Sequence, residues 1–171
     1  MEKYSFENDF LTLIDNALNL SIEETFNPIR LPQSPTDGER IDGSLVHVIK
    51  DDDDQVEEAY LTVDDVRSGQ WQLFYPSGTC KMEAFYQDNQ LHGPSTFYDE
   101  QGNVLAKSWF HKGLRQGKTR WFDSEGNLIS LQRFVDGVPK GIQEYYNPDG
   151  SRKSFILHEA GKRPCEVQSQ L

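Results

Sequence analysis

The chain has 171 residues, of which 36% are hydrophobic and 12% aromatic, enough to bury the core of one ordinary domain or two small ones. Its net charge of −11 is unevenly placed, since residues 1–68 hold 17 acidic and 5 basic residues while residues 69–171 hold 11 and 12. Such an acidic N-terminal part disfavours nucleic acid and anionic membrane surfaces as partners. No signal-peptide pattern and no apolar run of membrane-spanning length is present, so we expect a cytoplasmic protein, with non-classical secretion left open.

The first 43 residues form an acidic N-terminal segment. Phe6, Phe10 and Ile14 recur at helical spacing, so an amphipathic helix is expected at about residues 6–19. Residues 28–43 contain three prolines and two glycines among polar residues, which predicts a loop or linker.

Residues 44–68 predict one β-hairpin. The apolar runs Leu45–Ile49 and Val56–Val63 suit strands, and the acidic run Asp51–Asp54 lies where the turn between them belongs. A shift of 24 residues lays this hairpin over the glycine-rich sequence that follows. We therefore expect a degenerate repeat unit that caps the array.

The remaining sequence repeats with a period of 24 residues. Three series carry the period and use 11 of the 13 glycines: Gly69, Gly93, Gly117 and Gly141; Gly78, Gly102, Gly126 and Gly150; and Gly113, Gly137 and Gly161. The aromatic residues Phe74, Tyr98, Phe122 and Tyr146 follow the same spacing. The period defines four units, at residues 69–92, 93–116, 117–140 and 141–164, and leaves residues 165–171 as a tail.

Each unit contains a hairpin turn with specific chemistry. Asp or Asn comes first in three turns, Pro comes second in two, and glycine comes fourth in all, at Gly78, Gly102, Gly126 and Gly150. This pattern indicates a type I turn whose glycine supplies the left-handed residue of a bulge. The predicted fold is therefore mainly β: an elongated, twisted antiparallel sheet of tandem 24-residue β-hairpins, preceded by an α-helical segment.

Alternation along the second strand of each unit separates two faces of the sheet. One face carries small side chains followed by an aromatic residue, such as Ala106, Ser108 and then Phe110. This face is expected to be packed. The other, which we call the mixed face, combines charged and large apolar residues, and simple alternation assigns Ile129 and Lys153 to it. An apolar stripe on the mixed face has four members: Phe85, Trp109, Leu131 and Phe155.

Two interpretations of this stripe stay open. An apolar stripe rimmed by charge is typical of a partner-binding surface, and Trp109 would then be its anchor, since tryptophan is enriched among residues that dominate binding energy. Alternatively, the predicted N-terminal helix docks on the stripe.

The segment Phe97-Tyr-Asp-Glu-Gln-Gly-Asn-Val-Leu, followed by Lys-Gly-Leu-Arg-Gln-Gly at residues 112–117, resembles the units of the MORN-repeat variant family of bacteria. The resemblance covers residues 69–163 and implies a fold of stacked β-hairpins. Members of this family are often labelled antitoxin-like, and the broader MORN class is associated with protein contacts and sometimes lipid contacts. The resemblance therefore implies a protein partner.

The residues able to carry chemistry form no recognisable catalytic or metal-binding motif. The four histidines lie in different units without ligand spacing, and Asp51–Asp54 lacks the alternating ligands of a calcium loop. Cys80 and Cys165 are expected to be ordinary thiols. No nucleophile elbow, phosphate loop or marked pair of carboxylates is found. We expect no catalytic residue, no metal and no cofactor.

These observations predict a non-enzymatic scaffold that binds another protein. Antitoxin-like neutralisation of that partner follows only from the family resemblance. The alternatives are a secretion-related chaperone or secreted effector of a bacterial pathogen and, more remotely, a hydrolase within the unmatched residues 1–68.

Overall fold

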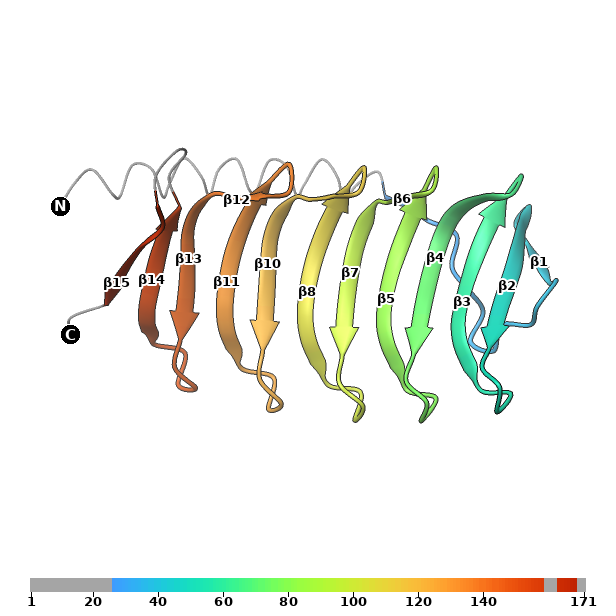
Figure 1. Cartoon of the computed structure of the whole chain (residues 1–171), viewed down its shortest axis with the longest axis horizontal. Helices are drawn as coiled ribbons and strands as arrows, with labels where there is room; N and C mark the ends of the chain where they lie inside the picture. The colour runs from blue at the N-terminus through green and yellow to red at the C-terminus, as the bar shows by residue number, and fades with distance from the viewer. Residues whose placement is uncertain (1–25, 159–162, 169–171) are drawn as a thin grey trace.

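The computed structural model describes residues 26–158 and 163–168, and the helix predicted at residues 6–19 lies outside them. Within the described residues, 15 strands form one antiparallel sheet and no helix is present. The strands lie side by side in a single row along the long axis of the molecule (Figure 1). The predicted antiparallel sheet of hairpins is therefore confirmed for this part of the chain.

Long strands form five successive hairpins: β2 (Ser44–Lys50) with β3 (Val56–Val63), β4 (Val66–Phe74) with β5 (Cys80–Gln87), β7 (Gly93–Tyr98) with β8 (Val104–His111), β10 (Gly117–Phe122) with β11 (Leu128–Val135), and β13 (Gly141–Tyr146) with β14 (Arg152–His158). Short strands complete the sheet: β1 (Arg40–Ile41), β6 (Gln90–Leu91), β9 (Leu114–Arg115), β12 (Val138–Pro139) and β15 (Cys165–Gln168). The last of these, expected as part of a tail, pairs with β14.

The turns that close the five hairpins share the same two backbone hydrogen bonds. In one of them Asp123 N donates to Asn127 O (3.0 Å) and Gly126 N donates to Asp123 O (3.1 Å). Gly126 has φ 85°, and the equivalent glycines of the other units have φ between 80° and 85°. Glycine adopts this left-handed backbone without a steric cost. In the Asp51–Gln55 turn, Asp54 (φ 62°) stands where the later units have glycine.

The aspartate that begins a turn holds its backbone in place. Asp123 Oδ1 accepts hydrogen bonds from the backbone N of Glu125 (3.0 Å) and of Asn127 (2.8 Å). Hydrogen bonds from the Asn127 side chain and backbone lower the pKa of Asp123 below its ordinary value. The preference for Asp at this position therefore follows from its local hydrogen bonding.

A β-bulge after each of these turns changes the face to which one side chain points. Trp121 pairs with Ser130 and Phe122 pairs with Leu128, which leaves Ile129 without a cross-strand partner. Bulges re-aim side chains in this way. Ile129 lines the same groove as Ser130, and so does Lys153, the bulge residue of the next hairpin. The assignment of Ile129 and Lys153 to the mixed face by simple alternation is therefore wrong.

Successive units are also joined through their second turns. Asn89 N donates to Arg67 O (3.0 Å), and the equivalent bonds run from Gly113 N to Leu91 O (2.8 Å) and onward at the same spacing. Within the described residues this bond therefore recurs in three successive units, as expected of a linear repeat array.

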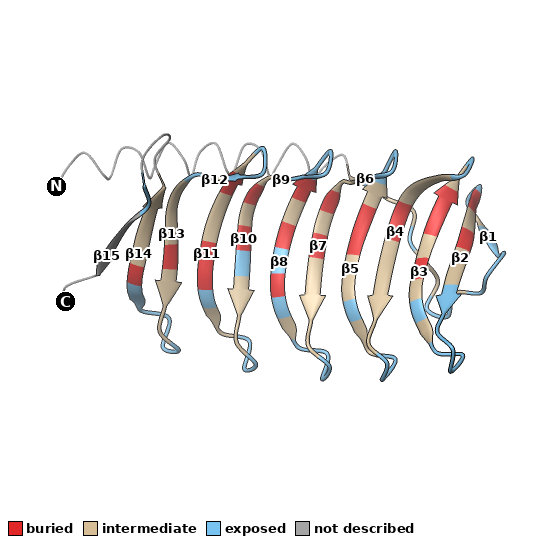
Figure 2. Cartoon of the chain, in the orientation of Figure 1, coloured by how far each residue is buried: buried red, intermediate tan, exposed pale blue. Residues whose placement is uncertain are grey.

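Most buried residues lie toward the strand ends that are away from the five hairpin turns (Figure 2). Val46, Ala59, Leu61, Ala84 and Phe85 are at most 2% exposed. Residues 26–31 contribute to this burial at Phe85, where the Phe26 ring and the Arg30 guanidinium lie against the Phe85 ring. Small buried side chains, such as Ser95 and Ser108, allow larger neighbours to close over them.

Candidate binding surfaces

Residues 26–31, which we call the strap, lie on the mixed face and cover part of the predicted stripe. The Phe26 ring meets Phe85 and Trp109 edge to face, with ring centroids 5.4 Å and 5.5 Å apart. The Arg30 guanidinium lies 5.0 Å from the Phe85 ring centroid. In Figure 1 the strap passes behind the strands, so the viewer sees the opposite face of the sheet.

Gln70 holds the strap by both its backbone and its side chain. Its backbone N donates to Ile29 O (2.9 Å), and its Oε1 accepts a hydrogen bond from Leu31 N (2.8 Å). Its Nε2 donates to Glu83 Oε2 (2.9 Å), and Arg30 approaches the Glu83 carboxylate at 3.9 Å. Gln70 is only 5% exposed, so these bonds form in a largely dry site.

The four stripe residues have different surroundings. Phe85 is 2% and Leu131 is 9% exposed, whereas Trp109 and Phe155 are half-buried. The Trp109 Nε1 is buried and has no hydrogen-bond partner. Partner binding by the stripe stays a prediction, and at Phe85 it would require the strap to move. The predicted helix at residues 6–19, the alternative occupant, lies outside the described residues.

A second polar cluster centres on Glu144, which is 7% exposed. Its carboxylate forms ion pairs with Arg133 (3.2 Å) and Arg152 (2.6 Å) and accepts a hydrogen bond from the Tyr146 hydroxyl (3.0 Å). Burial and the Glu144 charge raise the pKa of Tyr146, so its hydroxyl stays protonated at neutral pH. These bonds satisfy the buried carboxylate and give the cluster a structural role.

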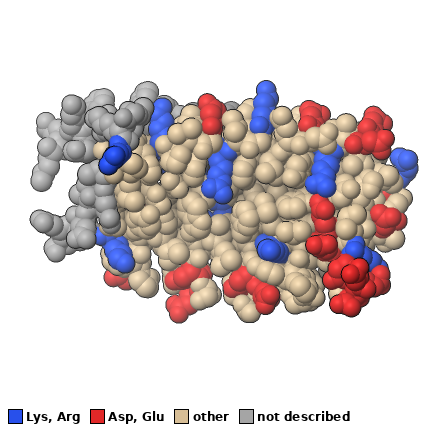
Figure 3. Space-filling view, viewed as in Figure 1, with Lys and Arg blue, Asp and Glu red and all other residues tan. Residues whose placement is uncertain are grey.

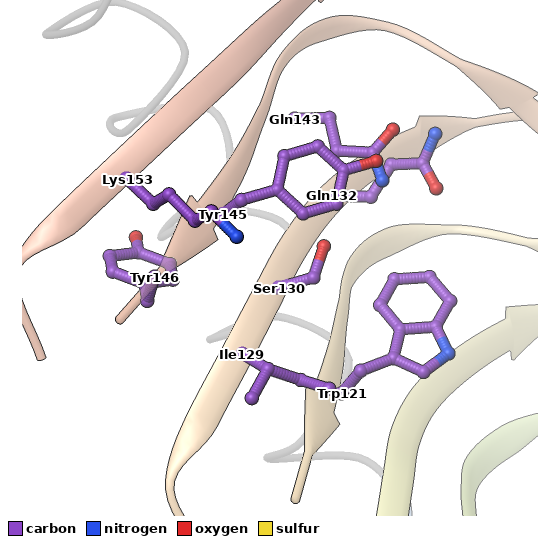
Figure 4. Close-up of a pocket in the computed structure, with 8 residues that line it drawn as sticks. All are labelled: Trp121, Ile129, Ser130, Gln132, Gln143, Tyr145, Tyr146 and Lys153. Carbon is purple, nitrogen blue, oxygen red and sulfur yellow. The ribbon is translucent and has the colours of Figure 1, made fainter. Parts of the chain in front are cut away.

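The opposite face, which we call the open face, carries an aromatic groove of about 510 Å³ near the end of the array. Its lining residues are Trp121, Ile129, Ser130, Gln132, Gln143, Tyr145, Tyr146 and Lys153. The Trp121 and Tyr145 rings lie on either side of Ser130, and the Gln132 and Gln143 amides lie beside Tyr145 (Figure 4).

The strand register explains why this groove forms. Ser130 is the cross-strand partner of both Trp121 and Tyr145, so one small side chain separates two large ones. The bulge adds the apolar side chain of Ile129, which is 38% exposed. The groove can therefore receive an apolar group between two rings, while the neighbouring amides can both donate and accept hydrogen bonds.

Most of the acidic charge on the open face lies at its edges (Figure 3). Acidic side chains gather at the hairpin turns, with the largest cluster at the turn between β2 and β3, and the middle of the face is mostly uncharged (Figure 3). Two arginines over the face lie against aromatic rings. The Arg67 guanidinium is 4.2 Å from the Tyr60 ring centroid, and the Arg115 guanidinium is 5.4 Å from the Phe134 ring centroid. The centre of the face is thus suited to apolar and hydrogen-bonding contacts.

The remaining chemically active side chains have ordinary surroundings. Burial, followed by the Glu83 charge, raises the pKa of the Cys80 thiol, which therefore stays protonated at neutral pH. His47 Nε2 lies 2.8 Å from Thr62 Oγ1. In the described part of the chain, no group of three or more His, Cys, Asp or Glu side chains could hold a metal ion. Nor does that part contain a helix long and apolar enough to span a bilayer.

Comparison with solved structures finds distant likenesses. Accessory secretory protein 1, 2 and 3 of Streptococcus pneumoniae is 15% identical, with a TM-score of 0.39 over 75% of this chain and 24% of that one. TarM of S. aureus, in complex with fondaparinux and UDP, is 13% identical, with a TM-score of 0.40 over 77% and 26% of the chains. A GtfA/B complex bound to UDP and GlcNAc is 12% identical, with a TM-score of 0.38 over 84% and 27%. The chain spans about a quarter of each of these chains, and likenesses at this level carry no information about function.

Comparison at the level of sequence is more specific. No curated protein matches the chain. Residues 67–88, which include most of β4 and all of β5, match the family model of the MORN repeat variant. This segment is thus a MORN-type repeat, as its resemblance to that family predicts.

Proposed function

We propose that the chain is a repeat scaffold that binds another protein through its open face, with the groove at Trp121 and Tyr145 as the centre of the contact. The observation that carries this proposal is the pair of half-exposed rings on either side of buried Ser130. Tryptophan and tyrosine are enriched at the centres of protein interfaces, where they fill or line pockets.

The chemistry of the groove supports a protein ligand. An apolar partner side chain would enter between the two rings, and the Gln132 and Gln143 amides would bond to the partner's polar groups. Lys153 at the rim adds a positive charge. In the narrower form of the proposal the partner is a protein that the scaffold neutralises, as the antitoxin-like label of MORN-variant proteins suggests. In either form the role is binding, without catalysis.

A matched pair of substitutions tests the proposal. Ile129→Asp places a carboxylate in the groove, and Leu105→Asp makes the same change at the equivalent bulge position one unit earlier. The two native side chains are 38% and 37% exposed. Affinity capture with the parent chain, followed by mass spectrometry, identifies the partner. Ile129→Asp should abolish its capture and Leu105→Asp should preserve it, with both variants folded. Equal capture by the two variants would contradict the role of the groove.

A further inference from the structure

The first glycine series is not explained by hairpin turns, because each member lies in a strand. Gly69 lies within β4, and Gly93, Gly117 and Gly141 are the first residues of β7, β10 and β13. All four have positive φ, between 71° and 107°. A glycine inside a strand often marks the close approach of another backbone or ligand.

The strap lies directly on two of these glycines. A Cβ at position 69 would lie 2.8 Å from Ile29 O, and one at position 93 would lie 2.6 Å from Cε2 of Phe26. By contrast, the turn glycine Gly102 has nothing within 4 Å of an added Cβ. Two features therefore favour glycine at positions 69 and 93: the positive φ shared by the whole series and the close contact with the strap.

The spacing of the strap matches the spacing of the units. Gly69 and Gly93 are one unit apart, which is two strand spacings or about 9 to 10 Å. Ile29 and Phe26 are three residues apart, and three residues of extended chain span about 9 to 11 Å. Pro28 and Pro32 favour such an extended backbone in the residues that precede them. Ile29 and Phe26, three residues apart, thus meet Gly69 and Gly93, two glycines one unit apart.

We propose that the glycines of the first series, which we call the glycine column, form a peptide-binding track. The track selects an extended segment with apolar side chains three residues apart, and the strap is its intramolecular occupant. A partner peptide with the same pattern would compete with the strap. Phe26 shows what the track selects, since its ring fits over Gly93 between Phe85, Trp109 and His92. Gln70 fixes the register by bonding to Ile29 O and Leu31 N.

The glycine column lies on the mixed face, away from the groove on the open face. The unit of β2 and β3 has Leu45 where the later units have the track glycine, so the track begins at Gly69. Gly117 and Gly141 hold the equivalent positions in the next two units, with φ 71° and 73°. A competing peptide would therefore engage the mixed face and leave the groove at Trp121 untouched.

The test uses the full chain with the double substitution Phe26→Ala and Ile29→Ala, which vacates the track. The probe is a fluorescein-labelled, acetylated peptide with the sequence of residues 26–33, and binding is followed by fluorescence anisotropy. The vacated chain should bind the probe at least tenfold more tightly than the parent chain. Adding Gly93→Val should reduce binding at least tenfold, whereas adding Gly102→Val, which also strains a positive-φ glycine but occupies open space, should not. Moving the two apolar residues of the probe to a spacing of two or four should abolish binding.

A second measurement covers the case in which the vacated chain does not fold. A protease site placed between the exposed residues Gln33 and Ser34 allows the parent chain to be cut after folding. The N-terminal fragment should stay bound through gel filtration and be released when the chain also carries Gly93→Val. Release from the parent itself, equal retention with Gly93→Val, or no binding of the probe to a folded vacated chain would overturn the proposal.

Discussion

Replacing Gly93 by alanine tests the contact between the sheet and the strap. The added Cβ would overlap the Phe26 ring, so the ring has to leave its place. Gly93 also has φ 107°, a conformation in which an L side chain is strained. Two costs therefore combine at this position: displacement of the Phe26 ring and strain of the backbone.

The expected magnitude follows from these two parts. A left-handed backbone costs an L residue about 1–2 kcal/mol. Truncating a fully buried Phe costs about 3–5 kcal/mol, so losing the contacts of the half-buried Phe26 ring should cost about 2 kcal/mol. Gly93→Ala should thus lower the free energy of unfolding by about 3–4 kcal/mol. Gly102→Ala, with φ 85° and open space around its Cβ, should cost only the backbone part.

Urea unfolding followed by tryptophan fluorescence measures these differences. In a chain that already carries Phe26→Ala, Gly93→Ala should cost no more than Gly102→Ala, because the ring it displaces is gone. The double-mutant cycle should therefore give an interaction energy of about 2 kcal/mol in size. Equal costs for Gly93→Ala with and without Phe26, or a cost matching that of Gly102→Ala in the parent, would refute the reasoning.

Four further results are expected. Trp109→Ala should destabilise the fold by about 2–3 kcal/mol in urea unfolding, since its half-buried ring packs on Phe26; an unchanged midpoint would contradict this packing. Gly126→Val should lower the melting temperature by about 2–8 °C through backbone strain alone, and a parent-like melt would exclude the bulged turn. Glu144→Gln should lower stability by about 2 kcal/mol, because it weakens the pairs with Arg133 and Arg152, and a neutral result would show that these pairs contribute little. Burial, then the positive groups His111 and Lys112, lowers the pKa of His92, and Asp88 opposes them. The contribution of His92 to stability should therefore be complete above its unfolded pKa and be lost as the pH falls below about 6.5. His92→Gln should reduce this pH dependence of the urea midpoint.

The sheet of hairpins could be predicted from the sequence because its determinants are local. The fourth residue of each hairpin turn has a positive φ. This residue is glycine in four of the hairpins and Asp54 in the first. The strand spans followed from alternation between these turns, so Val56–Val63 is found as expected. The face of Ile129 was mispredicted because a bulge breaks the alternation.

The strap could not be predicted from local pattern. Residues 28–43 have the composition of a linker, and the bond from Leu31 N to Gln70 joins residues 39 positions apart. One signal in the sequence did point to it: Gly69 and Gly93 recur within strands, where no hairpin turn requires glycine. The groove was missed for a related reason, since it depends on Ser130 lying between rings from two different hairpins.

The two faces of the sheet differ, because the strap covers part of the mixed face while the groove face is open. Hydroxyl-radical footprinting of the folded chain, with mass spectrometry of each peptide, measures this difference residue by residue. The parent should show fast oxidation at Trp121 and Tyr145 and protection at Phe85, which is 2% exposed. With Phe26→Ala, Phe85 and Trp109 should become reactive while Trp121 and Tyr145 stay as they were. Each oxidation rate is divided by that of the free amino acid. If Phe85 in the parent were then oxidised as fast as Trp121 and Tyr145, the two faces would not differ in this way.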